Sequence, residues 1–280
     1  MEKKEKLRKI LCILFAFLLS LSLFAALFTG TLKLTLLDKN FFSERLEKSG
    51  YSQSLYEKIV EELSNEGYIS GFDEAFFSQI LSVEDINAPV LSSVDRIYGT
   101  GEYVAASTEE ITETFFEEFI TSLEGRSVAV DEGQKEQIKA FAAECATYLS
   151  SNARLPFLSL GESLVKTAKP LTTYALIFLS VFALFCVGFI VTKNPNKKES
   201  LRYLSYGLSA TALMTATPAV VMLATGVLKK VSIADKGFYN LVQILGTDMS
   251  YIILAVAAVT LALSLILTAV YFIPSKSNKQ

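Results

Sequence analysis

The chain divides into long uncharged apolar runs and a polar middle region with a helical repeat of apolar positions. Four runs of more than 20 residues contain no Asp, Glu, Lys or Arg: Ile10 to Leu32, Leu171 to Thr192, Tyr203 to Leu228 and Tyr251 to Ile273. About 20 residues at a rise of about 1.5 Å per residue cross the hydrocarbon layer of a bilayer. Each run therefore predicts a transmembrane helix.

The region between the first and second runs is patterned as amphipathic helices. Apolar residues recur every four positions in two stretches: Leu55, Ile59 and Leu63, and then Ile111, Phe115, Phe119 and Leu123. Such spacing places the apolar side chains on one face of a helix. Period-two alternation, which indicates strands, is not sustained anywhere in this region. The predicted fold class is all-α: four transmembrane helices plus an extracytoplasmic helical bundle domain inserted between the first and second spans.

Helix boundaries are predicted from capping and helix-breaking residues. A helix over 41–66 is expected to end near Gly67, and a second to begin near Asp73. Pro89 is expected to start a new turn or to kink that helix, because proline disrupts a helix interior. Ser107 is expected to cap the next helix. Further helices are predicted over 132–149 and over 157–169, the latter leading into the second span.

The charge distribution predicts the orientation. Residues 38–169 hold 24 Asp+Glu against 11 Lys+Arg, whereas the whole chain has a net charge of only −3. The basic residues near the span ends fall in residues 1–9, 193–202 and 274–280, which together carry 11 Lys+Arg against three Asp+Glu. Because short cytoplasmic segments are enriched in Lys and Arg, both termini are expected in the cytoplasm, with the protein in the cytoplasmic membrane.

These patterns together predict nine consecutive segments. They are a basic cytoplasmic N-terminus (1–9), span one (10–32), an acidic helical extracytoplasmic domain (33–170), span two (171–192), a basic cytoplasmic loop (193–202), span three (203–228), a short extracytoplasmic loop (229–250), span four (251–273) and a cytoplasmic tail (274–280).

The first apolar run is predicted to be an uncleaved anchor. A cleaved signal peptide has an apolar core of about 7–15 residues, and this run is longer and lacks a clean small-residue cleavage site. A lipoprotein signal would need a small residue before Cys12, where Leu11 stands.

Composition narrows the chemistry that the chain can perform. There is no His, which removes the commonest general base and zinc ligand. Of the three cysteines, Cys12 and Cys186 lie in apolar runs, and Cys145 has no obvious partner, so a disulfide framework is excluded.

Three local patterns suggest chemistry, and each has a more ordinary explanation. Ser163 and Lys166 match the Ser-x-x-Lys pattern of serine acylases, but no strand is available to complete that site. A membrane-face acid–base cluster would need these residues: Glu162, Lys166, Lys169, Lys229, Lys230 and Asp235. The acids Glu109, Glu110, Glu113, Glu117 and Glu118 offer oxygen ligands for a divalent cation, yet they are typical of a solvated helix face. We predict no catalytic, cofactor-binding or metal-binding residues, and no cofactor.

Small and hydroxyl residues repeat four apart on the third and fourth spans. The pairs are Ser205/Ser209, Gly207/Thr211 and Ala212/Ala216, with Thr260, Ser264 and Thr268 on the fourth span. No span contains a charged residue, so close helix packing is favoured over a transport path. The same faces predict a homo-oligomer.

The predicted partners follow from charge and hydropathy. The lipid bilayer is one, and the basic ends are expected to contact anionic head groups. A protein partner is expected at the extracytoplasmic domain, whose negative charge argues against nucleic acid.

Two resemblances rest on short stretches. Glu199 to Gly207 keeps the Glu-to-Gly spacing of the coupling helix in permease subunits that work with a cytoplasmic ATPase, although Ser200 and Leu208 depart from that signature. The topology of one span, an outer domain and three spans is also similar to those permeases.

The second resemblance covers more of the chain. It is carried by Phe41-Phe42, Leu46 to Tyr51, Leu55-Tyr56, Val94 to Tyr98 and Leu201 to Gly207. These stretches look like uncharacterised four-pass membrane proteins of Gram-positive, clostridial-type bacteria. The resemblance implies the same topology and no known activity.

The sequence therefore predicts a non-enzymatic sensor, adaptor or envelope-associated binding protein that acts through its extracytoplasmic domain. The alternatives are a permease-like transporter subunit working with a cytoplasmic ATPase and, from a third class, a membrane enzyme.

Overall fold

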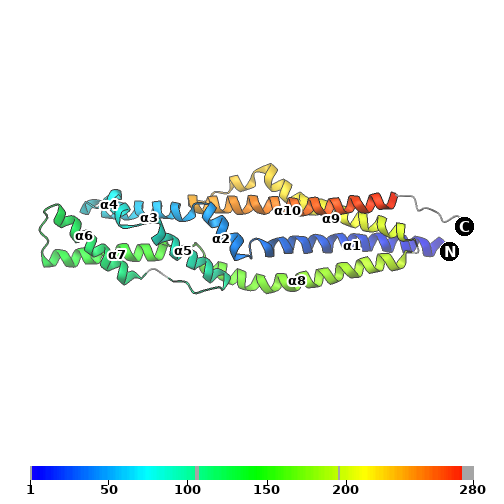
Figure 1. The fold of residues 1–280 in the computed structure, drawn as a ribbon, viewed down its shortest axis with the longest axis horizontal. Helices are drawn as coiled ribbons and strands as arrows, with labels where there is room; N and C mark the ends of the chain where they lie inside the picture. Colours follow the sequence, from blue (N-terminus) through cyan, green and yellow to red (C-terminus); the bar gives the residue numbers. More distant parts are fainter. Residues whose placement is uncertain (1, 105–106, 195, 273–280) are drawn as a thin grey trace. The chain divides into compact units, whose positions relative to one another are not determined.

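The computed structural model describes residues 2–104, 107–194 and 196–272, and its regular elements in these ranges are all helical (Figure 1). This confirms the predicted all-α class. The elements are α1 (Glu2–Leu34), α2 (Lys39–Lys48), α3 (Tyr51–Gly67), the 3-10 turn η1 (Tyr68–Ser70), α4 (Glu74–Ile80), α5 (Val83–Tyr98), α6 (Thr108–Gly125), α7 (Glu132–Asn152), α8 (Leu158–Lys193), α9 (Lys197–Thr225), the 3-10 turn η2 (Val227–Lys230) and α10 (Lys236–Phe272).

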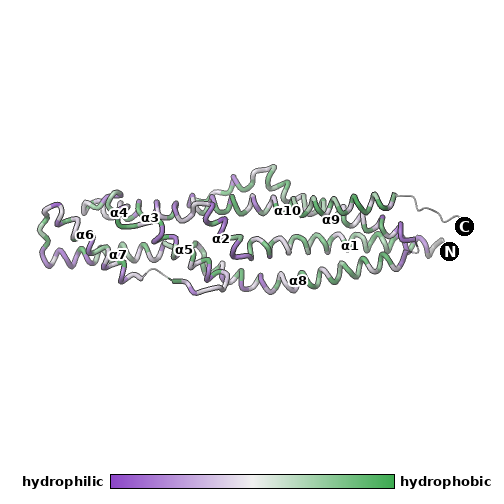
Figure 2. Tube along the Cα trace, in the orientation of Figure 1, coloured by the Kyte–Doolittle hydropathy of each residue, from purple (hydrophilic) through white to green (hydrophobic). Residues whose placement is uncertain are grey.

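Four of these helices are long and apolar enough to cross a membrane, as predicted from the uncharged runs. They are α8, α9 and α10 over their full lengths and α1 from Glu5 to Leu34. Figure 2 shows them as predominantly hydrophobic, whereas α6 and α7 carry many hydrophilic positions. The described chain is thus a multi-pass membrane protein by length and composition of its helices.

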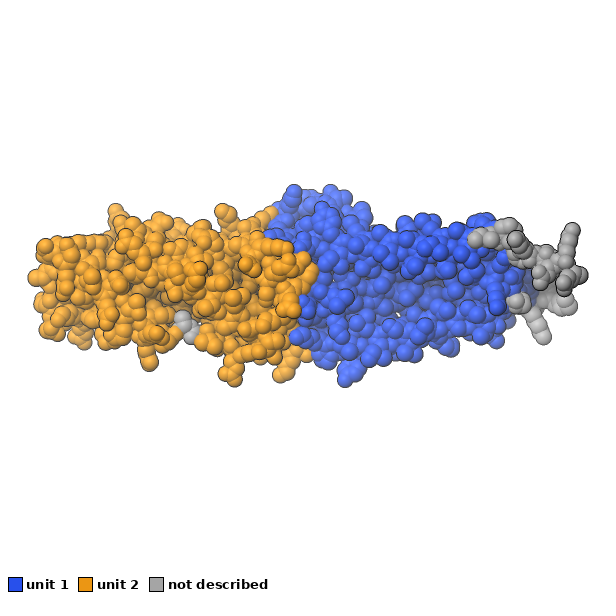
Figure 3. Space-filling view, in the orientation of Figure 1, with its two compact units in different colours: residues 1–38, 167–232, 242–280 blue, residues 39–166, 233–241 orange. Residues whose placement is uncertain are grey.

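The chain forms two compact units, coloured separately in Figure 3. Unit 1 contains residues 1–38, 167–232 and 242–280, and unit 2 contains residues 39–166 and 233–241.

In unit 1, α1 and α9 pack at close range because small residues meet between them. A Cβ atom added at Gly207 would lie 3.1 Å from the carbonyl oxygen of Ala16, and Thr211 Oγ1 donates a 3.2 Å hydrogen bond to the carbonyl oxygen of Ser20. α8 joins them through a core in which Cys12, Cys186 and Ile190 are fully buried.

Hydroxyl groups join α9 to α10. Ser205 and Ser264 exchange hydrogen bonds with one another's side chains and backbone, and Ser209 Oγ lies 2.6 Å from Ser264 Oγ. The hydroxyl stripes of the third and fourth spans therefore serve packing within the chain, as favoured from the sequence. The homo-oligomer predicted on the same faces stays a prediction.

Helix α10 begins earlier than the sequence indicated. The segment 229–250 is expected as a loop, but it is helical from Lys236 onward. Asp235 caps this helix, since its Oδ1 accepts a 2.8 Å hydrogen bond from the backbone N–H of Phe238. The expectation was wrong because the predicted fourth span included only uncharged residues and therefore began after Asp248. A helix can carry a charged residue, and α10 includes Asp248 and begins at Lys236.

Unit 2 is a helical bundle built on the predicted stripes. Leu55, Ile59 and Leu63 of α3 are buried, as are Phe115 and Phe119 of α6. Ser107 caps α6, its hydroxyl accepting a 3.4 Å hydrogen bond from the N–H of Glu110. These residues of the predicted stripes are therefore in the core of the bundle, whereas Ile111 and Leu123, at the two ends of the second stripe, are only half-buried.

One predicted boundary in unit 2 is wrong. Pro89 was expected to start a new turn or to kink a helix. It starts no helix, because it lies inside α5, which begins at Val83, and the kink stays a prediction. Ser82 and Asp85 form a capping box there: the Ser82 N–H donates to Asp85 Oδ2 at 2.8 Å, and the Asp85 N–H donates to Ser82 Oγ at 3.4 Å. This cap, rather than the proline, determines where the helix starts.

Replacing Phe119 by Ala should lower the free energy of unfolding of unit 2 by about 3–5 kcal/mol, because it empties the centre of a packed core. Phe119 is fully buried. The measurement is urea unfolding of the detergent-solubilised chain followed by circular dichroism. Tyr68→Ala is the control, because Tyr68 is 76% exposed and its loss should change the free energy by less than about 0.5 kcal/mol. Equal effects of the two changes would contradict this assignment of the core.

Candidate binding pocket

Six phenylalanine side chains gather where the segment after η1, α4, α6 and α7 meet in unit 2. The ring centroid of Phe119 lies 4.4 Å from that of Phe72 and 5.3 Å from that of Phe141. The remaining members are Phe76, Phe77 and Phe115. Offset and edge-on aromatic pairs of this kind add to the stabilisation from burial. The cluster is a rigid base for the surface next to it.

A pocket of about 250 Å³ lies beside this phenylalanine cluster. Three of the lining residues are polar, namely Ser70, Gln134 and Gln137. The other six are apolar: Phe72, Leu123, Val128, Val130, Ile138 and Phe141. Apolar pockets with a few polar groups are the usual form of ligand sites. We refer to it below as the α6–α7 pocket.

The connection between α6 and α7 forms one wall of the pocket. Ser127 has a φ of 60°, and the Val128 N–H donates to the Leu123 carbonyl at 3.1 Å, which turns the chain after α6. At the other side of the connection, Asp131 and Gln134 form a capping box with bonds of 2.8 and 2.9 Å. The two caps fix the intervening residues, including Val130, beside Ile138.

Arg126 fixes the opposite wall. Its Nη1 donates a 2.7 Å hydrogen bond to the carbonyl oxygen of Gly71, and its guanidinium lies 5.9 Å from the ring centroid of Phe72. Gly71 has a φ of 79°, a conformation that favours glycine, and a Cβ atom there would lie 2.8 Å from Arg126 Nη1. Arg126 thus adds to the backbone hydrogen bonds from Gly71 N–H to Tyr68 and from Phe72 N–H to Gly67, which also hold this turn.

Two large side chains of η1 are exposed next to this wall. Tyr68 is 76% exposed and Ile69 is 97% exposed, and Ser70 follows them directly in the same turn. Together with half-exposed Val128, they extend the apolar surface around the pocket.

A second, shallower groove lies along α7 and is acidic. It is lined by Glu66, Phe141, Ala143, Glu144, Thr147, Tyr148, Ser151 and Asn152. Burial raises the pKa of the Cys145 thiol to about 12, and the nearby carboxylates Glu66 and Glu144 add to the effect. A thiol held protonated in this way is a core residue and a poor nucleophile at neutral pH.

The Ser-x-x-Lys match does not form a site. Ser163 and Lys166 are both exposed on α8, and within the described residues no hydrogen bond joins them.

The proposed acid–base cluster is likewise divided among separate pairs. Glu162 Oε2 accepts a 2.9 Å hydrogen bond from Arg96 Nε of α5. Asp235 caps α10 and pairs with Lys58 at 3.7 Å. The two carboxylates are therefore each committed to a structural partner.

The acidic residues of α6 form a solvated face. Glu109, Glu110, Glu113, Glu117 and Glu118 are all exposed. Glu113 Oε1 pairs with Lys139 Nζ of α7 at 2.8 Å. In the part of the chain that the structure describes, no group of three or more His, Cys, Asp or Glu side chains is arranged to hold a metal ion.

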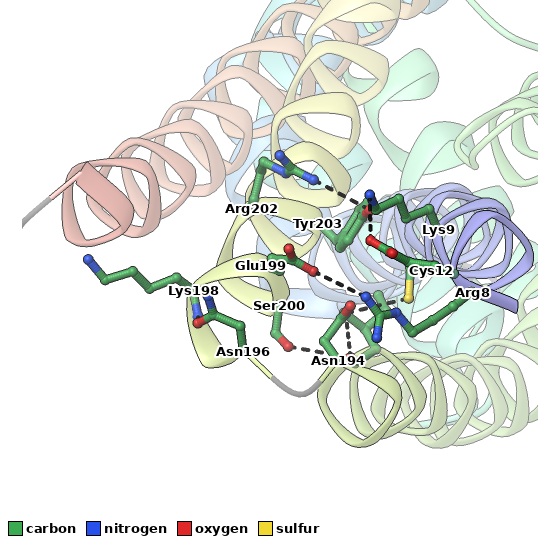
Figure 4. A network of polar contacts seen from close by, with 12 residues as sticks. Arg8, Lys9, Cys12, Asn194, Asn196, Lys198, Glu199, Ser200, Arg202 and Tyr203 are labelled. Carbon is green, nitrogen blue, oxygen red and sulfur yellow. Dashed lines mark hydrogen bonds and ion pairs between the residues drawn. The ribbon is translucent and has the colours of Figure 1, made fainter. Parts of the chain in front are cut away.

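The segment that resembles a coupling helix is the first part of α9 in unit 1 (Figure 4). Glu199 pairs with Arg8 of α1 at 3.9 Å, and Asn194 Nδ2 donates to the carbonyl oxygen of Ile190 at 2.9 Å. α8 ends at Lys193 and α9 begins at Lys197, so the connection has no room for a separate helix.

Comparison of the chain with protein-family models, curated proteins and solved structures finds no match to any of them.

The sequence indicated only part of the α6–α7 pocket. Leu123 belongs to a predicted apolar stripe, and Ile138 and Phe141 lie in the helix predicted over 132–149, whereas Ser70, Gln134 and Gln137 carry no signal of a site. The Asp131-to-Gln134 spacing is a capping-box signal that indicates where α7 starts. It gives no indication that η1 lies against α7, because that contact joins segments far apart in the chain.

Replacing Arg126 by Gln should loosen the segment around Gly71, because it removes a charged hydrogen bond worth about 1.5–3 kcal/mol. Hydrogen exchange of the amides of residues 68–73 should accelerate by about tenfold or more. Arg96→Gln is the matched control: it removes the ion pair to Glu162 and should leave these amides unchanged. Unchanged exchange in Arg126→Gln would show that other contacts position this wall.

Proposed function

We propose that the chain is a four-span protein of the cytoplasmic membrane, with both termini in the cytoplasm and with unit 2 in the extracytoplasmic space. The support is the charge asymmetry: the segment that contains the bundle is strongly acidic, and the basic segments lie at the opposite ends of the spans.

We further propose that it is a non-enzymatic binding protein, a sensor or adaptor, whose partner protein docks at the α6–α7 pocket. The observation that carries this is a pocket in which six of the nine lining residues are apolar, next to the η1 turn, where Tyr68 and Ile69 are exposed. Exposed Tyr and large apolar residues around a pocket are typical of binding hot spots.

The size of the pocket favours a side chain as its occupant. Sites for drug-sized ligands have volumes of about 300–1,000 Å³. At about 250 Å³, the α6–α7 pocket suits one large apolar side chain of a partner protein. Ser70, Gln134 and Gln137 offer hydrogen-bonding groups to the partner's backbone at the pocket rim.

The permease-like alternative requires the connection between α8 and α9 to contact an ATPase. The pairing of Glu199 with Arg8 gives that segment a role within the chain.

The orientation is tested by cysteine labelling. The three native cysteines are buried, so the parent chain is a control that should react little. A membrane-impermeant maleimide should label Glu117→Cys in intact spheroplasts and should label Lys197→Cys only after permeabilisation, because both positions are exposed. The reverse pattern would overturn the proposed orientation.

The docking site is tested by site-specific photocrosslinking in cells. A photoreactive residue at Ile69 should capture a defined protein that is not captured from Leu91, a 42% exposed position outside the pocket lining. Leu123→Trp, which fills the pocket, should reduce the yield at Ile69 by about tenfold or more, since hot-spot losses exceed about 2 kcal/mol.

The folding of Leu123→Trp is checked by circular dichroism. An equal crosslinking yield from Ile69 and from Leu91 would show that the pocket is not the docking site. A crosslinking yield from Ile69 that a folded Leu123→Trp variant leaves unchanged would show the same.

A further inference from the structure

A second hollow lies among the four candidate spans of unit 1 and is independent of the proposed function of unit 2. It has a volume of about 430 Å³, and all four spans contribute to it: Leu19 of α1, Leu184 and Val187 of α8, Leu204 and Leu208 of α9 and Leu267 of α10. Among the described residues that line it, Ser180 is the only polar one. We refer to it as the span groove.

The span groove is open at the surface of the helices. Leu184 is 70% exposed and Ser180 is exposed, whereas Leu19 on the inner side is 2% exposed. In a membrane, this open side faces lipid. A chain-like apolar molecule is favoured in this hollow, because it would make dispersion contacts with the apolar lining. Acyl chains are the molecules of that chemistry in a bilayer.

The face of α9 that lines the groove leads to a basic side chain. Lys197, Leu201, Leu204 and Leu208 recur at positions i, i+4, i+7 and i+11, which lie on one side of a helix. At a rise of about 1.5 Å per residue, Leu204 and Leu208 lie about 10 and 16 Å from Lys197 along the axis. That matches the depth of one leaflet, about 15 Å, so a head group at Lys197 would place its acyl chain over these leucines.

The charges at this end suit an anionic head group. Residues 193–202 contain four basic residues and one acid, and that acid, Glu199, is paired with Arg8. Lys197 is exposed and forms no ion pair with any other residue that the structure describes. A phosphate diester would complement this surplus of positive charge.

We propose that the span groove is a binding site for one anionic phospholipid. One acyl chain lies against Leu184, Leu204 and Leu208, and the phosphate pairs with Lys197. The site selects anionic over zwitterionic phospholipid.

The chain has no Trp, so one engineered Trp reports on the groove alone. Leu184→Trp places it at the rim, and Val187→Trp is a second reporter if the first variant does not fold. The full chain is reconstituted in phosphatidylcholine vesicles that contain a low mole fraction of either brominated phosphatidylglycerol or brominated phosphatidylcholine. Quenching of the Trp fluorescence is compared between the two brominated lipids at equal mole fraction. The anionic lipid should bind about fivefold more tightly, the factor equal to about 1 kcal/mol for one lysine near an anionic group.

Three variants and one control position for the Trp separate a specific site from general surface attraction. In the reporter background, Lys197→Gln should abolish the preference, and Lys230→Gln, in the separate 3-10 turn η2, should keep it. Ser180→Phe, which fills the groove, should lower quenching by either lipid. A Trp at Leu265, 61% exposed on α10 and outside the lining, should show no preference.

Equal quenching by the two lipids at the groove reporters would overturn the proposal. So would a preference that survives Lys197→Gln, or one that is as large at Leu265, because either result would indicate non-specific accumulation of anionic lipid.

Discussion

The constraint on which this structure depends is that backbone N–H and C=O groups have no water to bond with inside a bilayer. Each apolar run must therefore be a helix, with its backbone bonds closed within the segment. The hydroxyl side chains in these runs obey the same rule. Thr31, Thr211 and Thr260 each donate to the carbonyl oxygen four residues earlier in their own helix. A polar side chain thus costs little in a span, and it can add a second bond to a neighbouring helix, as Thr211 does with Ser20.

Helix association inside the membrane then relies on close packing, because lipid is as apolar as the side chains. Gly207 and Ala16 let α9 approach α1, and the Ser205, Ser209 and Ser264 hydroxyls hold α9 to α10. The span groove lies where leucine and valine side chains fill the space less completely. Unit 2 has the opposite balance: phenylalanines are buried in its core, and carboxylates such as Glu117 are exposed.

The features that could be predicted from the sequence are those encoded by local spacing. Leu55, Ile59 and Leu63 indicate a buried helix face because residues four apart share one side of a helix, and that inference needs no tertiary contact. The start of α5 is also encoded locally, by the Ser82–Asp85 capping box. Pro89 was expected to mark a helix boundary instead, because proline disrupts helices. The α6–α7 pocket could not be predicted, because the hydrogen bond from Arg126 to Gly71 joins residues 55 positions apart.

The perturbed titrating groups of unit 2 indicate structural pairing. Hydrogen bonding from Lys39 lowers the pKa of Asp95, and desolvation raises the pKa of Tyr51, whose hydroxyl donates to the carbonyl oxygen of Arg154 at 3.2 Å. Acid–base catalysis needs such a group to face a cleft that a substrate can enter. Asp95 and Tyr51 line neither the α6–α7 pocket nor the acidic groove along α7, whereas Tyr148, whose pKa is raised by burial, lines the acidic groove. The pocket's polar groups are a hydroxyl and two amides, which bind and orient but do not titrate near neutral pH. The uncharged polar groups of the α6–α7 pocket therefore suit the recognition of a partner, which is the role that the proposed function assigns to this pocket.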